Sequence, residues 1–167
     1  GVVTSFSYDS HNQLTSSISA RNGVTLSTNN YEIGLDGQSR VKESIDNLTG
    51  NKTTYAYDEH NQTKSATVTN HEGKVISTQA FEIGVNGQSR IHSSTDTLTG
   101  NVTAYAYDAN NHLLTATVSN ADGKQLSIQD YGINVDGSDR LDNTVDLLTG
   151  NRTTYTYDAN GQTSSAQ

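Results

Sequence analysis

The sequence predicts an all-β fold: an array of antiparallel β-hairpins with about four strands in every 50 residues and essentially no helix. Three observations predict this. The segment Leu48-Thr49-Gly50-Asn51 returns at 98–101 and again at 148–151, which is a period of 50. Asn-Gly and Asp-Gly pairs recur where hairpins should turn. Between them, β-branched and aromatic residues alternate with small polar ones, and no segment has helical periodicity.

The repeats divide the chain into a single array of four parts. We expect repeat 1 over residues 1–50, one residue shorter near its start, repeat 2 over 51–100, repeat 3 over 101–150 and a partial repeat 4 over 151–167. The recurring positions are Tyr-Asp pairs, turn glycines, arginines and aspartates: Tyr8, Asp9, Tyr57, Asp58, Tyr107, Asp108, Tyr157 and Asp158; Gly37, Gly87 and Gly137; Arg40, Arg90 and Arg140; Asp46, Asp96 and Asp146. Each repeat also looks internally duplicated, because Tyr31, Phe81 and Tyr131 each begin a stretch that parallels the Tyr-Asp segment.

Turn chemistry predicts the elements in order. Positive φ comes most easily to Gly, so we expect tight turns at 22–23, 36–37, 86–87, 122–123, 136–137 and 160–161. In the second repeat, turns near 59–62, 70–73, 84–87 and 97–101 leave four strands of about 8 to 10 residues each. The chain has no Pro, so every strand can donate its full ladder of N–H groups.

Composition limits both the core and the partners. Only 31% of the residues are hydrophobic, which predicts a thin layer of Tyr, Ile, Leu and Val in place of a thick core, with the Tyr hydroxyls reaching water. The balance of 10 Lys and Arg against 18 Asp and Glu gives a net charge of -8, which disfavours nucleic acid. No apolar run is long enough to span a membrane, so we expect a soluble chain without membrane insertion. Cysteine is absent, which excludes disulfides and thiolate metal sites.

No segment predicts catalysis or a dedicated metal site. The many Ser residues lie in repeating turns, and the His residues do not recur as a ligand set. We therefore expect no cofactor, although the acidic turn at 136–139 leaves structural calcium open. Asn-x-Thr sequons at 51–53, 101–103 and 151–153 leave glycosylation open as well.

The arginine column predicts a ladder of structural ion pairs that fixes strand register. The plausible partners are the aspartates at 46, 96 and 146 or those at 58, 108 and 158. The alternative is a ligand-binding stripe of these arginines with Tyr55, Tyr105 and Tyr155, which would suit a glycan or another ligand on a host surface.

The segments Tyr55-Ala56-Tyr57-Asp58, Tyr105-Ala106-Tyr107-Asp108 and 153–162 resemble the YD repeats of the bacterial Rhs family. The resemblance implies a spiralling β-strip on a secreted or surface protein, which in some members curls into a hollow shell around a toxin domain. The half-repeats that start at Tyr31, Phe81 and Tyr131 depart from the pattern, because they lack the second Tyr and the Asp. Four strands per 50 residues also suits a propeller blade, but three and a third repeats cannot close a ring and the blade signatures are absent.

These observations predict a non-enzymatic, extracellular or cell-surface structural repeat protein, a segment or subunit of a fibre. Neither end of the sequence looks like a capping repeat, so we expect either a longer array or completion by another copy that meets it end to end. The alternatives are a carbohydrate- or host-binding adhesin stalk and a fragment of an Rhs-type toxin-encapsulating shell.

Overall fold

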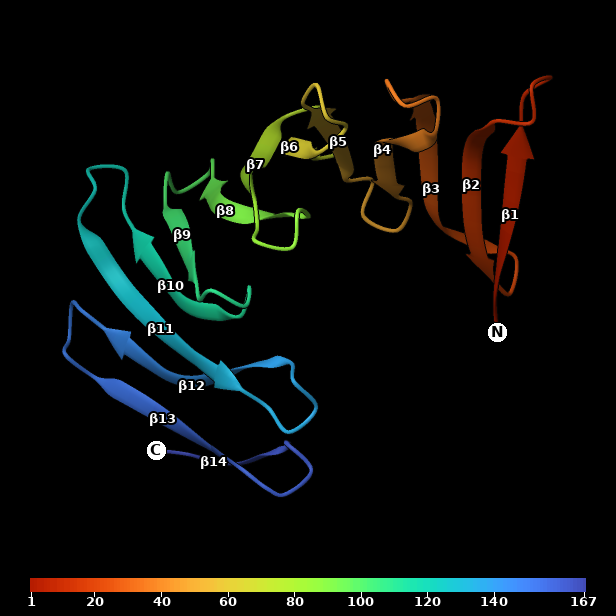
Figure 1. Cartoon of the computed structure of the whole chain (residues 1–167). Coiled ribbons are helices and arrows are strands. Elements are labelled where there is room, and N and C mark those ends of the chain that lie inside the picture. Colours follow the sequence, from red (N-terminus) through yellow and green to blue (C-terminus); the bar gives the residue numbers. More distant parts are fainter. The chain divides into compact units, whose positions relative to one another are not determined.

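The computed structural model describes all 167 residues and confirms the all-β prediction, with 14 strands and no helix (Figure 1). No helix is therefore available to cross a bilayer. The strands, in chain order, are β1 (Val2–Tyr8), β2 (Leu14–Arg21), β3 (Val24–Ile33), β4 (Ser39–Asp46), β5 (Lys52–Tyr57), β6 (Thr63–Thr69), β7 (Val75–Ile83), β8 (Ser89–Asp96), β9 (Val102–Tyr107), β10 (Leu113–Ser119), β11 (Gln125–Ile133), β12 (Asp139–Asp146), β13 (Arg152–Tyr157) and β14 (Thr163–Ala166).

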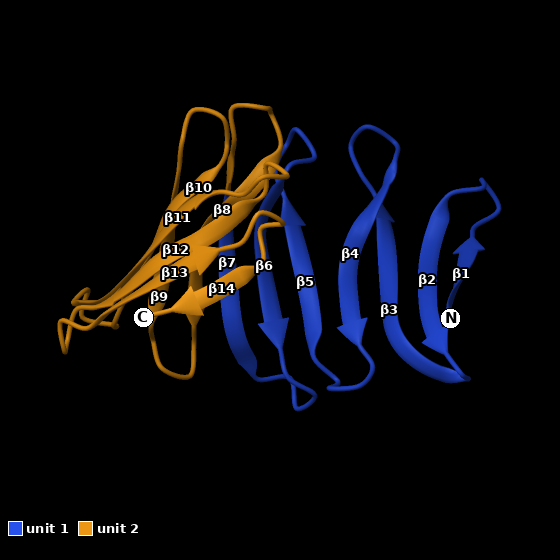
Figure 2. Ribbon diagram, turned by 90° about the horizontal axis from the view of Figure 1, so that it is seen from below, with its two compact units in different colours: residues 1–81 blue, residues 82–167 orange.

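The chain forms two compact units, residues 1–81 and residues 82–167, called unit 1 and unit 2 here (Figure 2). Within unit 1, β1 to β7 lie side by side in chain order, and each strand is antiparallel to the next. Within unit 2, β8 to β14 follow the same simple meander. Four strands fall in each complete period of 50 residues, as the turn positions predict.

Several strands are shorter than the predicted 8 to 10 residues. The strands that carry the Tyr-x-Tyr motif, β5, β9 and β13, have six residues each. They end early because the Asp that follows the second Tyr folds the chain into a turn. The carboxylate oxygen Oδ1 of Asp58 accepts hydrogen bonds from the backbone N–H groups of His60 and Gln62, both at 2.9 Å. This local bond competes with continued strand pairing and ends the strand.

Most hairpin turns are three-residue loops in which one residue has positive φ, and the turn at Asn22 and Gly23 is a two-residue loop. In the 34–38 turn the Gly37 N–H bonds to the Gly34 carbonyl at 3.0 Å, and Gly37 has φ of 78°. Asn22 and Gly23 have φ of 51° and 78°, so both central residues are left-handed, as a type I′ turn requires. The residue missing from repeat 1 was removed here, because the corresponding turn at 70–73 has one residue more.

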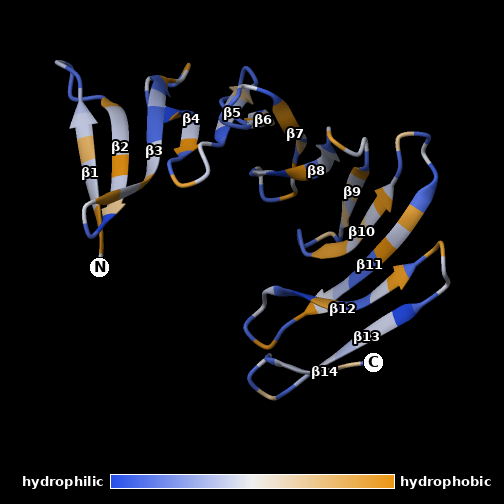
Figure 3. Cartoon of the chain, turned by 180° about the vertical axis from the view of Figure 1, so that it is seen from behind, coloured by the Kyte–Doolittle hydropathy of each residue, from blue (hydrophilic) through white to orange (hydrophobic).

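The core is as thin as the composition predicts. The buried hydrophobic residues are Ala66 and Ala116, each 1% exposed, and no large side chain is fully buried. Ala66 lies opposite Tyr55 across β5 and β6, and Ala116 lies opposite Tyr105 across β9 and β10. Hydrophobic and hydrophilic residues alternate along strands such as β11 (Figure 3). Tyr55 and Tyr105 therefore each pair with an alanine on the neighbouring strand, and such cross-strand pairs stabilise the sheet.

Candidate functional site: an arginine clasp in each repeat

The first arginine of the column stands at the centre of a polar cluster in unit 1, which we call the first clasp. Arg40 on β4 lies directly opposite Glu32 on β3, and its Nε and Nη2 atoms donate to Glu32 Oε1 at 2.9 and 2.8 Å. Its Nη1 atom donates to Oδ1 of Asn61, in the next hairpin turn, at 2.6 Å. The guanidinium carbon stands 4.1 Å from the centre of the Tyr57 ring. One side chain thus joins three strands and a turn.

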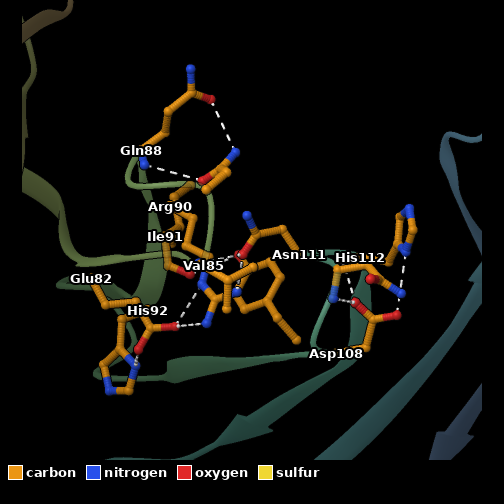
Figure 4. A network of polar contacts seen from close by, with 12 residues as sticks. Glu82, Val85, Gln88, Arg90, Ile91, His92, Asp108, Asn111 and His112 are labelled. Atoms are coloured by element: carbon orange, nitrogen blue, oxygen red, sulfur yellow. Dashed lines mark hydrogen bonds and ion pairs between the residues drawn. The ribbon is translucent and has the colours of Figure 1, made fainter.

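A second clasp of the same construction lies in unit 2 (Figure 4). Arg90 Nε and Nη2 bind Oε1 of Glu82 at 2.8 and 2.7 Å, and Arg90 Nη1 donates to Asn111 Oδ1 at 2.6 Å. The guanidinium carbon is 4.2 Å from the Tyr107 ring centre. Glu82 Oε2 also lies 3.2 Å from His92 Nδ1, so this carboxylate is shared between two basic groups.

The asparagine of each of these clasps lies in one turn and bonds both to the arginine and to the preceding clasp-side turn. Asn61 Oδ1 also accepts the backbone N–H of Leu35 at 2.9 Å, and Asn111 Oδ1 accepts that of Val85 at 3.1 Å. Both asparagines have positive φ, 61° and 70°. The turn of one hairpin is therefore fastened to the turn of the next through a side chain 26 residues away in the sequence.

The third clasp, also in unit 2, has the same arginine and tyrosine, but its carboxylate and its amide come from different positions in the sequence. Arg140 Nε donates to Asp142 Oδ1 at 3.0 Å, and its guanidinium carbon is 4.9 Å from the Tyr157 ring centre. Gly132 stands where the first two clasps have glutamate. The carboxylate has thus moved from the strand opposite the arginine to the arginine's own strand.

The amide of the third clasp has moved in the same way. The first two clasps have Gly34 or Gly84 in one turn and asparagine in the next, whereas the third has Asn134 in the first turn and Gly161 in the second. Asn134 Oδ1 accepts the N–H of Val135 at 2.9 Å, and its Nδ2 atom reaches the Gly161 carbonyl at 3.5 Å. The junction between the two turns is kept although both residues differ.

The predicted partners of the arginines were wrong. The column of Asp46, Asp96 and Asp146 caps the loops after β4, β8 and β12: Asp46 Oδ1 accepts the backbone N–H groups of Leu48 at 2.9 Å and Thr49 at 3.3 Å. The N–H of Leu48, followed by the bonds to Thr49, lowers the pKa of Asp46 below its usual value.

The Asp column of the Tyr-Asp pairs is also used within its own turn. Backbone N–H groups of Gln62 and then His60 lower the pKa of Asp58, and those of His112 and then Asn110 lower the pKa of Asp108. In both residues these N–H groups bind Oδ1, which holds the carboxylate in its own turn. The arginines pair instead with Glu32, Glu82 and Asp142, which are not among the recurring positions of the sequence.

The second tyrosine of each Tyr-x-Tyr motif does not send its hydroxyl to water, contrary to our expectation. Tyr57 donates to the Val41 carbonyl at 2.5 Å, Tyr107 donates to the Ile91 carbonyl at 2.7 Å, and Tyr157 donates to the Leu141 carbonyl. Burial raises the pKa of both Tyr57 and Tyr107 above the usual tyrosine value. These hydroxyls tie each Tyr strand to the arginine strand beside it.

The first tyrosines, Tyr55, Tyr105 and Tyr155, are half-buried and stand outside the clasps. Their proposed role in a ligand stripe stays a prediction. The arginines of the first two clasps offer little to a ligand, because Nε, Nη1 and Nη2 all have protein partners and one face lies on a tyrosine ring. The clasps therefore have the chemistry of structural junctions.

The other sites considered from the sequence are the turn glycines and a possible metal site. The turn glycines Gly37, Gly87 and Gly137 all have positive φ, between 76° and 83°, as the turns require. No three His, Asp or Glu side chains come together as a metal site, and the Asp136 carboxylate accepts the N–H and hydroxyl of Ser138. An open hollow of about 390 Å³ lies in unit 1 beside Lys52, Thr69 and His71.

Two signals in the sequence could have found the missed residues. A three-residue loop at 35–37 places residue 32 opposite residue 40, which gives Glu32 as the arginine's partner. Asparagine recurs three positions after the Asp of the Tyr-Asp pair, at Asn12, Asn61 and Asn111, and each of the three has positive φ. Gly132, which replaces the glutamate in repeat 3, and Gly161, which replaces the asparagine in the partial repeat 4, interrupt the two columns.

Comparison with known proteins supports the fold and the repeat. Residues 86–125 match the family model of the RHS Repeat, while no curated protein matches the chain. The crystal structure of TcdB2-TccC3-Cdc42 is similar over 96% of this chain at 16% identity, with a TM-score of 0.51. Two further structures have lower TM-scores. TcdB2-TccC3-TEV is similar over 99% of this chain and 12% of that chain, at 14% identity and a TM-score of 0.47. A porin-like protein from Bacteroides uniformis is similar over 96% of this chain and 79% of that chain, at 14% identity and a TM-score of 0.46.

The likeness to TcdB2-TccC3-Cdc42 concerns the fold alone, and this chain spans 9% of the length of that one. Residues 86–125 contain Arg90, Tyr107 and Asn111, so the segment that matches the family model includes most of the second clasp. The matched segment confirms the resemblance that the Tyr-x-Tyr-Asp motifs carry: residues 86–125 of this chain contain an Rhs repeat.

Proposed function

We propose that this chain is a structural segment of an extracellular surface fibre, in which Rhs repeats follow one another strand by strand. The observation that carries the proposal is the recurrence of the arginine clasp in all three full repeats. Each clasp joins the turn of one hairpin to the next hairpin. Catalytic residues need not recur in every repeat, whereas a structural junction must.

The clasps supply what a thin sheet lacks. A two-stranded hairpin is marginal by itself, and with so few fully buried apolar side chains the sheet depends on bonds between neighbours. Arg90 and Asn111 connect hairpins with both charge-assisted and amide bonds, and Tyr107 adds a bond to the backbone of the arginine strand. A mechanical force applied along the array would then be distributed over the clasps of successive repeats.

A toxin-encapsulating shell is the second candidate, and one observation favours it. A fold similar to 96% of this chain is found within TcdB2-TccC3-Cdc42, where it accounts for 9% of that chain. In such a shell the same clasps would stiffen a curved wall. An adhesive role for the tyrosines has no comparable observation in its favour.

Immunogold electron microscopy of the source cells tests the proposal and separates the two candidates. Antibodies against residues 1–167 should label projections outside the envelope of intact cells. Label on compact particles would favour the shell, and label that appears only after the cells are permeabilised would overturn an extracellular role. Purified chains with Arg40, Arg90 and Arg140 changed to Met should also unfold at lower force than the original chain in single-molecule pulling.

A further inference from the structure

The chain contains six Asn-Gly or Asp-Gly pairs, and all of them lie in hairpin turns. In five of the pairs the glycine N–H donates to the carbonyl of the residue three positions earlier, at 2.9 or 3.0 Å; these glycines are Gly37, Gly87, Gly123, Gly137 and Gly161. The sixth pair, Asn22-Gly23, forms the loop between β2 and β3 in unit 1 (Figure 1). There the flanking residues Arg21 and Val24 pair with each other, and the Gly23 N–H has no hydrogen-bond partner. The backbone nitrogen of Gly23 is therefore not held in place as the other five are.

The side chain of Asn22 is equally unrestrained. Asn22 and Gly23 are both exposed, and the Asn22 amide has no hydrogen-bond partner. No atom stands within 4 Å of the place where a Cβ on Gly23 would lie, so the loop has open space beside it. Of the other two Asn-Gly pairs, Asn86 binds Gln88 twice through its amide, at 3.2 and 3.1 Å, and Gly161 lies against a side chain of another turn. Only at Asn22 are the amide and the following backbone nitrogen both free to move.

We propose that Asn22 is a site of spontaneous deamidation, and that it reacts before the other two asparagines that precede a glycine. The backbone nitrogen of Gly23 loses its proton and attacks the side-chain carbon Cγ of Asn22. A new C–N bond forms, the C–N bond of the side-chain amide breaks, and the amide nitrogen takes up a proton and leaves as ammonia. Water then opens the resulting succinimide ring at either carbonyl, which gives aspartate or isoaspartate at position 22. Water is the only co-reactant, and nothing is oxidised or reduced.

The free N–H of Gly23 determines which asparagine reacts first. Glycine has no Cβ to hinder the attack, so all three Asn-Gly pairs share that advantage. The attack also requires the peptide between Asn and Gly to rotate, and a hydrogen bond from the glycine N–H resists this rotation until the bond breaks. One bond of ordinary net strength slows such a step by about two- to tenfold. Asn86 must in addition give up its amide bonds to Gln88.

Both products change the β2–β3 hairpin. Each replaces a neutral amide by a carboxylate and so adds negative charge to a chain whose net charge is already -8. Isoaspartate also leads the main chain through the side-chain carbons of residue 22, which lengthens a loop whose two residues have φ of 51° and 78°. The corresponding loops of repeats 2 and 3 end in Glu72-Gly73 and Asp122-Gly123, so this deamidation is specific to repeat 1. The modification goes beyond the fibre proposal and does not depend on it.

Incubation of the purified full chain in mildly alkaline buffer tests the proposal. Samples taken over several weeks are digested with pepsin at low pH, and mass spectrometry gives the fraction of each asparagine that has become aspartate or isoaspartate. In the folded chain Asn22 should react at least about twofold faster than Asn86 and Asn160. In the same buffer with urea this difference should disappear, because unfolding breaks the hydrogen bonds of the turns.

Two variants supply a matched control with a second readout, the transfer of a labelled methyl group to isoaspartate by an isoaspartyl methyltransferase. Asn22→Gln keeps an amide but disfavours ring closure, and it should remove most of the label that the folded chain acquires. Asn86→Gln should leave the label unchanged.

An Asn22 that stays intact in the folded chain would overturn the proposal, as would faster conversion at Asn86 or Asn160. Equal rates at the three sites in the folded chain would overturn it too. A preference for Asn22 that persists in urea would show that the turn is not its cause. None of these results bears on the clasps or the fibre role, which the labelling and pulling experiments address.

Discussion

Exchanging Gly84 and Asn111 should cost much less stability than changing either residue alone. Asn111→Gly removes an acceptor for Arg90 Nη1 at 2.6 Å and for the Val85 N–H at 3.1 Å, while it relieves a non-glycine φ of 70°. A bond to a charged group is worth roughly 1.5–3 kcal/mol, and the strain of positive φ is about 1 kcal/mol, so the net loss is about 1–2 kcal/mol.

The opposite single change creates a collision. A Cβ atom at Gly84 would stand 2.6 Å from Asn111 Oδ1, closer than real Cβ atoms come to oxygen. In Gly84→Asn, the Asn111 side chain must swing away and give up both hydrogen bonds while its positive φ remains. We expect a loss of roughly 2–3 kcal/mol.

The double variant should recover most of this loss, because the third clasp already contains the exchanged pair, Asn134 and Gly161. There Asn134 binds the N–H that follows it, and Gly161 leaves space for it. We therefore expect the double variant to lie within about 1 kcal/mol of the original chain, with a coupling of about 2 kcal/mol or more. Urea unfolding followed by circular dichroism and tyrosine fluorescence measures the four free energies of unfolding.

A control cycle pairs Gly84→Asn with Asn110→Gly, which changes an exposed residue of the same turn without touching the clasp. That cycle should be additive. If the free-energy changes of Gly84→Asn and Asn111→Gly instead sum to that of the double variant within about 0.5 kcal/mol, the reasoning that only one of the two side chains fits in this space is refuted.

Three further outcomes follow from the clasps and turns. Tyr107→Phe loses the bond to the Ile91 carbonyl and should cost about 1 kcal/mol in urea unfolding, whereas Tyr105→Phe, whose hydroxyl has no protein partner, should stay within about 0.5 kcal/mol. Asp108→Asn should flatten the loss of stability on acidification between about pH 5 and pH 2, because a lowered pKa gives stability that is present above the unfolded value and disappears as pH falls through the folded one. Gly50→Ala should cost about 1–2 kcal/mol more than Gly150→Ala in thermal unfolding: both glycines have positive φ, but only at position 50 would a Cβ stand 2.8 Å from a neighbouring turn's side chain.

The sequence was sufficient to predict the strands, because alternation and turn glycines act locally. It was not sufficient to predict the arginine partners, because these depend on register and on competition. Asp58 is close to Tyr57 in the sequence and carries the right charge, yet its Oδ1 is bonded within its own turn. Glu32 has no motif around it, and only the loop length places it opposite Arg40. The strand lengths were overestimated for the same reason, since a carboxylate that folds its own turn ends the strand early.

What recurs along this chain is the contact more than the residue. Between the second and third clasps the carboxylate moves from Glu82 to Asp142, and the amide moves from Asn111 to Asn134. In both cases a glycine stands at the position that the polar residue has left: Gly132 replaces the glutamate, and Gly161 replaces the asparagine. A Cβ at Gly132 would collide with the Asp142 carboxylate, and a Cβ at Gly161 would collide with the Asn134 amide. Each contact therefore has room for one polar group, supplied from either side. Paired exchanges across 10 and 27 residues of sequence are expected where a junction between strands must be kept, and the scaffold role proposed here requires such junctions.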